Sequence, residues 1–148
     1  MEITNVLRFT DRDGFRQWLT KHADHAAFCW VILSRKQIGD GLLYLDAVEE
    51  ALCFGWIDGI AKKTEDGELA QRFTPRRKNS NWTELNKERV RRLERLGLMQ
   101  PSGRQVLPDM RTDAFVIDDA IQARLQEDPV VYEQFNDFPE LYRRIRID

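Results

Sequence analysis

The sequence is poor in the side chains that most often carry out nucleophilic and metal chemistry. Its 148 residues include two cysteines and two histidines. The motifs GxSxG, GxxxxGK(S/T), GxGxxG, HExxH and CxxC do not occur in it. General acid–base chemistry would therefore fall to carboxylates alone. These shortages favour a protein that is not an enzyme, and we expect no catalytic residue, no metal and no cofactor.

Long apolar runs are also missing, since the longest are far too short to cross a bilayer as a helix. The first residues lack the basic start and apolar stretch of a signal peptide, so we predict a cytoplasmic protein. Cys29 and Cys53 each lie inside an apolar run, which predicts two reduced thiols in the core. A disulfide or a reactive thiol is the alternative.

The composition that remains is typical of one globular domain with a modest core and a charged surface. Hydrophobic residues make up 42% and charged residues 32% of the sequence. Eight Phe, four Trp and three Tyr supply large apolar faces, which excludes a disordered chain. The length of 148 residues is that of a single domain.

The net charge of −2 hides a segregation of charge along the chain. Residues 71–104 hold ten Lys or Arg and three Glu, a net charge of +7, and the rest of the chain is net −9. A basic segment of this kind can form a basic face in the folded protein.

The pattern of apolar residues predicts an α+β fold. Phe15, Trp18 and Leu19 recur at helical spacing after Thr10, which we predict as the N-cap of the first helix. An Asp-Gly pair at 66–67 between two strand-like segments is typical of a hairpin. In chain order the predicted elements are a helix 11–22, a strand 28–33, a loop 34–41, a helix 44–54 and hairpin strands 57–63 and 68–74.

The helix 44–54 is predicted to carry an apolar stripe on one side and charged side chains on the other. Leu45, Val48 and Leu52 form the apolar stripe, and Gly55 stops the helix. The charged side chains on the opposite face are Asp46, Glu49 and Glu50.

The second half of the sequence is predicted to be helical. Asn81 and Glu84 form a capping-box pattern before a helix 82–96, whose Lys, Arg and Glu side chains give it an exposed charged face. Further helices are predicted at 101–107, 118–127, 129–138 and from 139 onward, with a loop at 108–117. We therefore predict a domain 1–107, with about three antiparallel strands covered by helices 11–22 and 44–54, and a C-terminal helical segment 118–148 packed on it.

The first candidate for a binding site is the motif Phe-Gly-Trp-Ile-Asp-Gly at 54–59. Trp56 and Asp58 are two residues apart on a strand, so both side chains point to the same face. An indole and a carboxylate placed in this way would line a pocket. The alternative is a corner in which Trp56 packs in the core and Asp58 pairs with Arg72 or Arg76.

The second candidate combines guanidinium groups, a hydroxyl and an aromatic ring just before the helix 82–96. Such groups together favour the binding of an anion. The alternative is a solvated basic loop in which Trp82 is a core residue. The ligand-binding residues predicted from both motifs are Trp56, Asp58, Arg72, Arg76, Arg77, Ser80 and Trp82.

A third pattern, His22 and His25 around Asp24, is half of a metal site. A structural or catalytic zinc site takes three or four protein ligands, and no second group of ligands accompanies this pair. We therefore predict no metal here.

Three separated blocks resemble a known bacterial family. They are residues 44–59, 72–82 and 86–103. In this order and spacing they resemble the family named for bacteriocin protection and for association with YdeI or OmpD, over residues 5–145. Residues 125–144 resemble the family's tail, whereas its further basic helix has no counterpart here. The resemblance implies a role in resistance to antimicrobial peptides, and it carries over no catalytic residue.

Three functions follow as hypotheses. The first is a non-enzymatic binding protein for a small anionic ligand or a protein partner, in antimicrobial resistance or stress, with its site at the two motifs. The second is a nucleic-acid-binding module that uses the basic segment 72–95, although a pI near 5.8 does not favour it. The third is an enzyme with Asp58 as its acid or base.

Overall fold

The computed structural model describes all of the chain except residues 36–40. Most of the predicted loop 34–41 therefore lies outside the described residues. The chain divides after residue 107, at the end of the predicted first domain, but residues 81–88 group with the C-terminal helices. The two compact units are residues 1–80 with 89–107, and residues 81–88 with 108–148.

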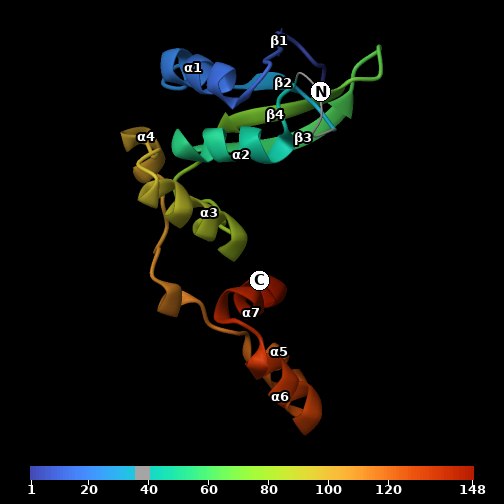
Figure 1. The fold of residues 1–148 in the computed structure, drawn as a ribbon, viewed down its shortest axis with the longest axis vertical. Helices are drawn as coiled ribbons and strands as arrows, with labels where there is room; N and C mark the ends of the chain where they lie inside the picture. The colour runs from blue at the N-terminus through green and yellow to red at the C-terminus, as the bar shows by residue number, and fades with distance from the viewer. Residues whose placement is uncertain (36–40) are drawn as a thin grey trace. The chain divides into compact units, whose positions relative to one another are not determined.

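The first unit is built on a four-stranded sheet (Figure 1). Its elements in chain order are β1 (Val6–Leu7), α1 (Arg12–His22), β2 (Cys29–Leu33), α2 (Tyr44–Cys53), β3 (Trp56–Lys63), β4 (Leu69–Pro75), the later part of α3 (Glu84–Arg95) and α4 (Pro101–Arg104). The strand order is β1-β2-β4-β3. Helices and strands occur together in one unit, so the predicted α+β class is confirmed.

The strand β1 was not predicted, and it makes the sheet mixed instead of purely antiparallel. It pairs in parallel with β2, so that Val6 lies opposite Trp30 and Leu7 opposite Val31. The other two strand pairs are antiparallel, as predicted. A strand of two residues is too short to show an alternating pattern, so it could not be predicted from periodicity.

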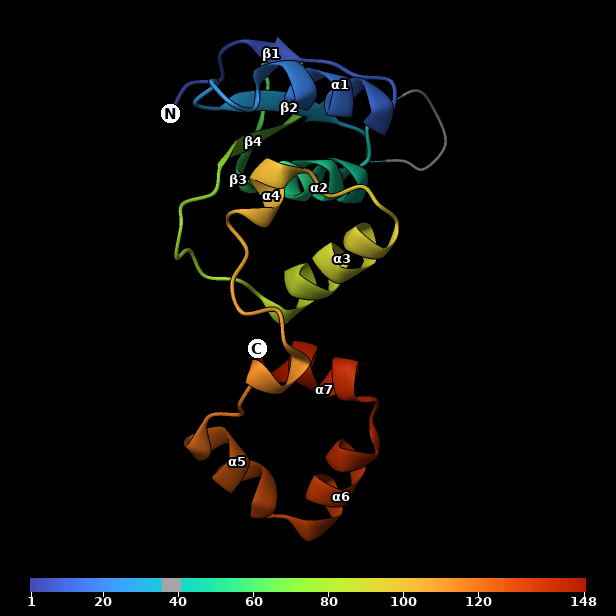
Figure 2. The same ribbon diagram turned by 90° about the vertical axis from the view of Figure 1, so that its left-hand side faces the viewer.

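The helices α1 and α2 lie side by side on one face of the sheet (Figures 1 and 2). An aromatic cluster fixes α1 to the strands. The rings of Phe15 and Phe73 are 5.3 Å apart, and Trp18 meets Trp56 edge to face at 5.9 Å. Such pairs contribute about 0.5–1.5 kcal/mol beyond the burial of their area.

A β-bulge interrupts the strand β3. Its register against β4 shifts between Asp58 and Ala61. The buried side chain of Gln71 donates from Nε2 to the carbonyl oxygens of Gly59 at 2.7 Å and Ile60 at 3.2 Å. A side-chain amide thus satisfies the carbonyl groups of the bulge, where the ladder is broken.

The short helix α4 packs against the C-terminal end of α2. Gly55, with φ of 77°, follows α2 as predicted. The backbone N–H of Gln100 donates to the carbonyl of Cys53 at 2.9 Å, and Ser102 Oγ donates to the carbonyl of Phe54 at 3.1 Å. Gly103 permits this approach, because an added Cβ there would lie 2.3 Å from the Cys53 carbonyl oxygen.

The second unit is helical. It contains the start of α3, a 3₁₀ turn η1 (Thr112–Ala114), α5 (Asp119–Gln126), α6 (Pro129–Asp137) and α7 (Glu140–Ile147). The buried Glu84 links α3 to α7, because it accepts from Arg144 Nη1 at 3.1 Å and lies 3.0 Å from Lys87 Nζ. Gln122 donates to the Tyr132 hydroxyl at 2.9 Å and so joins α5 to α6. Among all the described helices, none is long and apolar enough to cross a membrane.

Two predicted N-caps are corrected by the structure. Asp11, not Thr10, caps α1, because its carboxylate accepts from the backbone N–H of Gly14 at 3.0 Å. Thr83, not Asn81, caps α3, because its hydroxyl accepts from the N–H of Asn86 at 3.1 Å. In both places several capping residues are adjacent, and the sequence alone does not choose among them.

Substitution of Gly103→Ala tests the packing of α4 on α2. We expect it to lower the free energy of unfolding by about 1–3 kcal/mol, because the new methyl group meets backbone atoms that cannot move independently. The control is Gly59→Ala, whose Cβ would have its nearest neighbour at 3.6 Å. Urea unfolding of both variants measures the difference, and equal stabilities would show that α4 can shift freely.

Candidate functional site

Trp56, the first of the predicted site residues, is part of the core. Its side chain is only 1% exposed, and its indole N–H donates to the carbonyl of Ala23 at 3.3 Å. The ring is further enclosed by Trp18. This corrects its assignment to the wall of a pocket, because the aromatic cluster beneath α1 covers the face that a ligand would need. Trp56 therefore packs in the core, which was the alternative interpretation of the motif.

Asp58, Arg76 and Ser80 are brought together with a residue that was not predicted, Tyr44. The Tyr44 hydroxyl, at the start of α2, donates to Asp58 Oδ2 at 2.6 Å. After the end of β4, Arg76 Nη1 donates to Ser80 Oγ at 3.1 Å. The backbone N–H of Arg76 donates to the carbonyl of Gly55 at 2.8 Å, just before the start of β3, the strand that carries Asp58. We call these four residues the Asp58–Arg76 cluster.

Burial sets the electrostatics of this cluster. Arg76 is 6% exposed, and burial lowers its pKa, while the negative charge of Asp58 opposes that shift. Tyr44 is 45% exposed, but partial burial and the hydrogen bond to Asp58 together raise its pKa to about 12. Tyr44 is therefore protonated at neutral pH and acts as a hydrogen-bond donor, not as a base.

The remaining predicted residues are not part of this cluster as the structure describes it. Arg72 places its guanidinium 4.7 Å from the ring centre of Phe28, a cation–π contact on the strand β4. Arg77 is exposed. Trp82 belongs to the second unit, whereas the other six predicted residues belong to the first.

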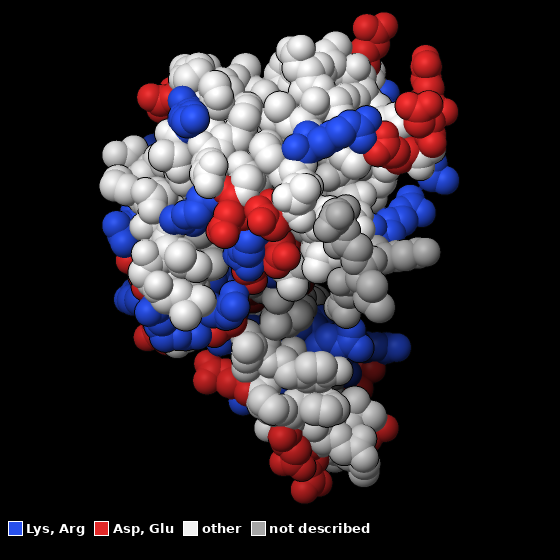
Figure 3. Space-filling model, turned by 45° about the horizontal axis from the view of Figure 1, so that its top comes forward, with Lys and Arg blue, Asp and Glu red and all other residues white. Residues whose placement is uncertain are grey.

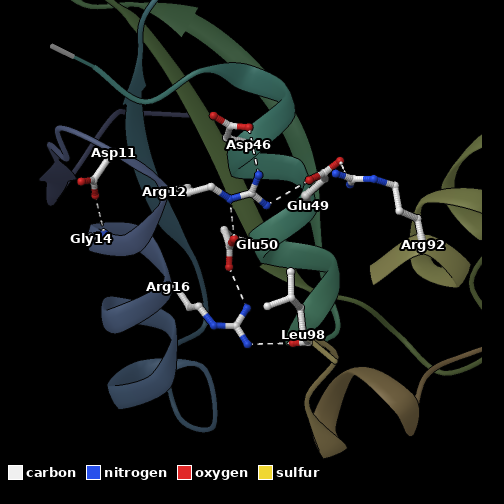
Figure 4. Close-up of polar contacts among 9 residues, drawn as sticks. All are labelled: Asp11, Arg12, Gly14, Arg16, Asp46, Glu49, Glu50, Arg92 and Leu98. Carbon is white, nitrogen blue, oxygen red and sulfur yellow. Dashed lines mark hydrogen bonds and ion pairs between the residues drawn. The ribbon is translucent and has the colours of Figure 1, made fainter. Parts of the chain in front are cut away.

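Two buried glutamates on α2 are the centre of a network of ion pairs in the first unit (Figure 4). Glu49 and Glu50 on α2 are 6% and 2% exposed, although they lie opposite the predicted apolar stripe. A charged helix face is usually solvated, but this one is buried. The side is covered by guanidinium groups from α1 and α3, and the residues of this arginine–glutamate network are Arg12, Arg16, Asp46, Glu49, Glu50 and Arg92.

Every carboxylate oxygen of the two buried glutamates has a guanidinium partner. Glu50 accepts hydrogen bonds from Arg12 Nε at 2.7 Å and from Arg16 Nη1 at 2.8 Å. Glu49 accepts hydrogen bonds from Arg12 Nη2 and from Arg92 Nη1, both at 2.9 Å. Burial alone would lower the pKa values of Arg12 and Arg16, but the hydrogen bonds to these carboxylates raise them further than burial lowers them. The network is thus mutually neutralised and structural in character.

Ion pairs also neutralise some of the cations in the basic segment 72–95, which was predicted to bind nucleic acid. Arg92 is paired with Glu49 in the network, and Lys87 with the buried Glu84. On the face shown in Figure 3, Lys and Arg side chains lie among Asp and Glu side chains. Phosphate binding needs cations that are not already neutralised, so this arrangement does not favour the nucleic-acid hypothesis.

Groups suited to a metal are sparse in the described residues. They contain no group of three or more His, Cys, Asp or Glu side chains that could hold a metal ion. His22 Nδ1 lies 3.4 Å from His25 Nε2, and His25 Nδ1 lies 2.8 Å from an Asp24 oxygen. These exposed rings interact with each other, and the prediction about metal remains untested.

Sequence reasoning missed Tyr44 and the arginine–glutamate network. One signal for the network was present, because Arg12 and Arg16 are four residues apart on one helix, as Asp46 and Glu50 are on another. Two helices with complementary charges at this spacing can pair along their lengths. No pattern in the sequence predicts the contact between Tyr44 and Asp58, because it depends on how α2 packs against β3.

Comparison with known proteins gives a domain family and no activity. The family model described as a domain of unknown function (DUF8412) matches residues 7–106. No curated protein and no solved structure matches the chain.

From the contacts in the network we expect Glu50 to contribute much more to stability than Asp46. Glu50→Gln should lower the free energy of unfolding by about 3–5 kcal/mol, because it leaves Arg16 without a carboxylate partner and removes one of the carboxylates that bind Arg12. Asp46→Asn is the control, since Asp46 also contacts Arg12 but is 34% exposed, and it should cost no more than about 1 kcal/mol. Chemical unfolding measures both, and equal losses would contradict the structural role of Glu50.

The two thiols should be inert in the folded protein. Cys29 and Cys53 are buried and free, as predicted, and burial raises their pKa values to about 12 and about 11. Because the thiolate is the reactive form, a disulfide-exchange reagent at pH 7–8 should label neither thiol in the native state and both after unfolding. Rapid labelling of the native protein would show that one thiol is accessible.

Proposed function

We propose a binding function for this chain, which belongs to the domain family DUF8412. The chain acts as a non-enzymatic binding protein for a small anionic ligand, and the ligand contacts the Asp58–Arg76 cluster. The observation that carries the proposal is the buried Arg76 guanidinium, held beside a serine hydroxyl and a carboxylate.

A buried guanidinium favours an anion for two physical reasons. Burial disfavours the charged form of Arg76, so a negative charge nearby stabilises the folded protein. A guanidinium also presents planar N–H donors that match the oxygens of a carboxylate or phosphate group. The negative charge of Asp58 opposes the effect of burial on the Arg76 pKa, as a bound anion would.

The chemistry of the same residues supports binding over catalysis. Tyr44 has a pKa of about 12 and stays protonated at neutral pH, so it orients Asp58 without abstracting a proton. Both cysteines are buried, with raised pKa values. The enzyme hypothesis, with Asp58 as acid or base, and the nucleic-acid hypothesis both remain predictions without further support.

The biological setting is the less constrained part of the proposal. A role in resistance to antimicrobial peptides or in stress depends on the resemblance to the bacteriocin-protection family described above, which remains a prediction. The cytoplasmic location likewise remains a prediction from the N-terminal sequence. Both are secondary to the binding function, which depends on the geometry of the cluster.

Calorimetric titration with inorganic phosphate and with acetate tests the binding function. We expect Arg76→Gln to weaken binding at least tenfold, because a hydrogen bond to a charged group contributes about 1.5–3 kcal/mol. Arg77→Gln is the matched control, since it removes the same charge from the adjacent exposed position. Ser80→Ala should weaken binding less.

Thermal unfolding of each variant separates loss of binding from loss of fold. If Arg76→Gln bound both anions as tightly as the wild-type protein, the assignment of the site would be wrong. If the folded wild-type protein bound neither anion, the proposed ligand class would be wrong.

A further inference from the structure

A small cavity in the second unit has the features of a separate binding site. It has a volume of about 190 Å³ and lies between the segment around η1 and the helix α7. At roughly 30 Å³ for each water molecule in the liquid, this is the space of about six waters. The residues that line it and bear on its chemistry are Asp113, Phe115, Ile117, Glu140, Arg143 and Arg144.

Two arginines that line this cavity have hydrogen-bond donors without a partner in the described part of the chain. Arg144 is 7% exposed, and its Nη1 donates to Glu84. The Nε atoms of Arg143 and Arg144 are both buried and have no hydrogen-bond partner among the described residues. Glu140 Oε1 is 3.8 Å from Arg144 Nε, which is close enough for attraction but too far for a hydrogen bond.

Buried donors without acceptors are uncommon in folded proteins. Each one left unsatisfied costs about 1–3 kcal/mol, and more when the group is charged. A ligand oxygen that accepts from Arg143 or Arg144 would remove this penalty. The basic side of the cavity is therefore suited to a carboxylate group.

The other sides of the cavity select against a simple anion. Two carboxylates line the cavity beside the two guanidinium groups, because Asp113 is exposed and the Glu140 side chain is 65% exposed. Phe115 and Ile117 add apolar surface. A site that presents groups of both signs matches a ligand that carries one charge of each sign.

We propose that this cavity binds a free α-amino acid with an apolar side chain. The ligand carboxylate accepts from Arg143 and Arg144, and its ammonium group lies near Asp113 and Glu140. Its side chain contacts Phe115 and Ile117. The volume suits so small a ligand, because pockets for drug-sized molecules begin at roughly 300 Å³. This site lies in the second unit and is independent of the Asp58–Arg76 cluster.

The side-chain Nε–H signals of arginine in the ¹⁵N-labelled full-length protein report on the site directly. Titration with L-leucine should shift the Arg143 and Arg144 signals in a saturable manner. Leucinamide, which lacks the carboxylate, and 4-methylpentanoate, which lacks the ammonium group, should each bind at least tenfold more weakly. Inorganic phosphate should not reproduce the shifts.

Variants on α7 provide the controls. Arg143→Gln and Glu140→Gln should each weaken leucine binding at least tenfold, whereas Arg146→Gln, at an exposed position three residues further along the helix, should not. The backbone amide spectrum shows whether each variant remains folded, and the largely exposed Glu140 makes its variant the safer test.

Four outcomes would overturn the proposal. They are the absence of saturable shifts with leucine, equal binding of leucinamide, equal shifts with phosphate, and unchanged leucine binding by a folded Glu140→Gln protein. Each would remove one part of the recognition described above. Loss of phosphate binding by Arg76→Gln has no bearing on these results, because that residue lies in the other unit.

Discussion

The pairing of two buried glutamates with three arginines is the interaction on which the first unit depends. An isolated carboxylate in an apolar interior is strongly disfavoured, so Glu49 and Glu50 require counter-charges wherever α2 is covered. Arg12 reaches both of them from α1, which fixes how the two helices align along their lengths (Figure 4). Arg16 extends this alignment by donating to the carbonyl of Leu98 at 2.7 Å, so the chain after α3 is tied to the same point.

This fixed position of α2 matters for the candidate site, because the helix begins with Tyr44. A residue at the end of a firmly held helix keeps its hydroxyl in place better than one on a loop. Asp58 is supported in the same way, since it lies just before the bulge that Gln71 stabilises. The Asp58–Arg76 cluster is therefore positioned by two rigid elements, and only Arg76 and Ser80 come from the connection after β4.

Most of the fold was predictable from local patterns, whereas the polar contacts were not. Helical spacing and the Asp-Gly pair at 66–67 correctly located α1, α2 and the β3–β4 hairpin to within one or two residues. The burial of Glu49 and Glu50 could not be predicted from periodicity. A charged helix face is usually exposed, and the pattern of one helix carries no information about the helices that cover it. Periodicity also failed for the contact between Tyr44 and Asp58, which depends on how α2 lies across the sheet. Alternating patterns place a side chain on a face, but a partner on another element has to come from the tertiary structure.

The bulge in β3 has a further consequence for the behaviour of the protein in concentrated solution. β3 is the last strand of the sheet, and such a strand offers hydrogen-bonding groups on which a second molecule can build an intermolecular sheet. The break in register at Gly59 and Ile60, with Gln71 occupying their carbonyl groups, removes a regular template from this strand. Lys62 and Lys63 add charge to its far end. The strand that carries Asp58 thus combines two features, a bulge and charged side chains, that disfavour pairing of its edge with another sheet.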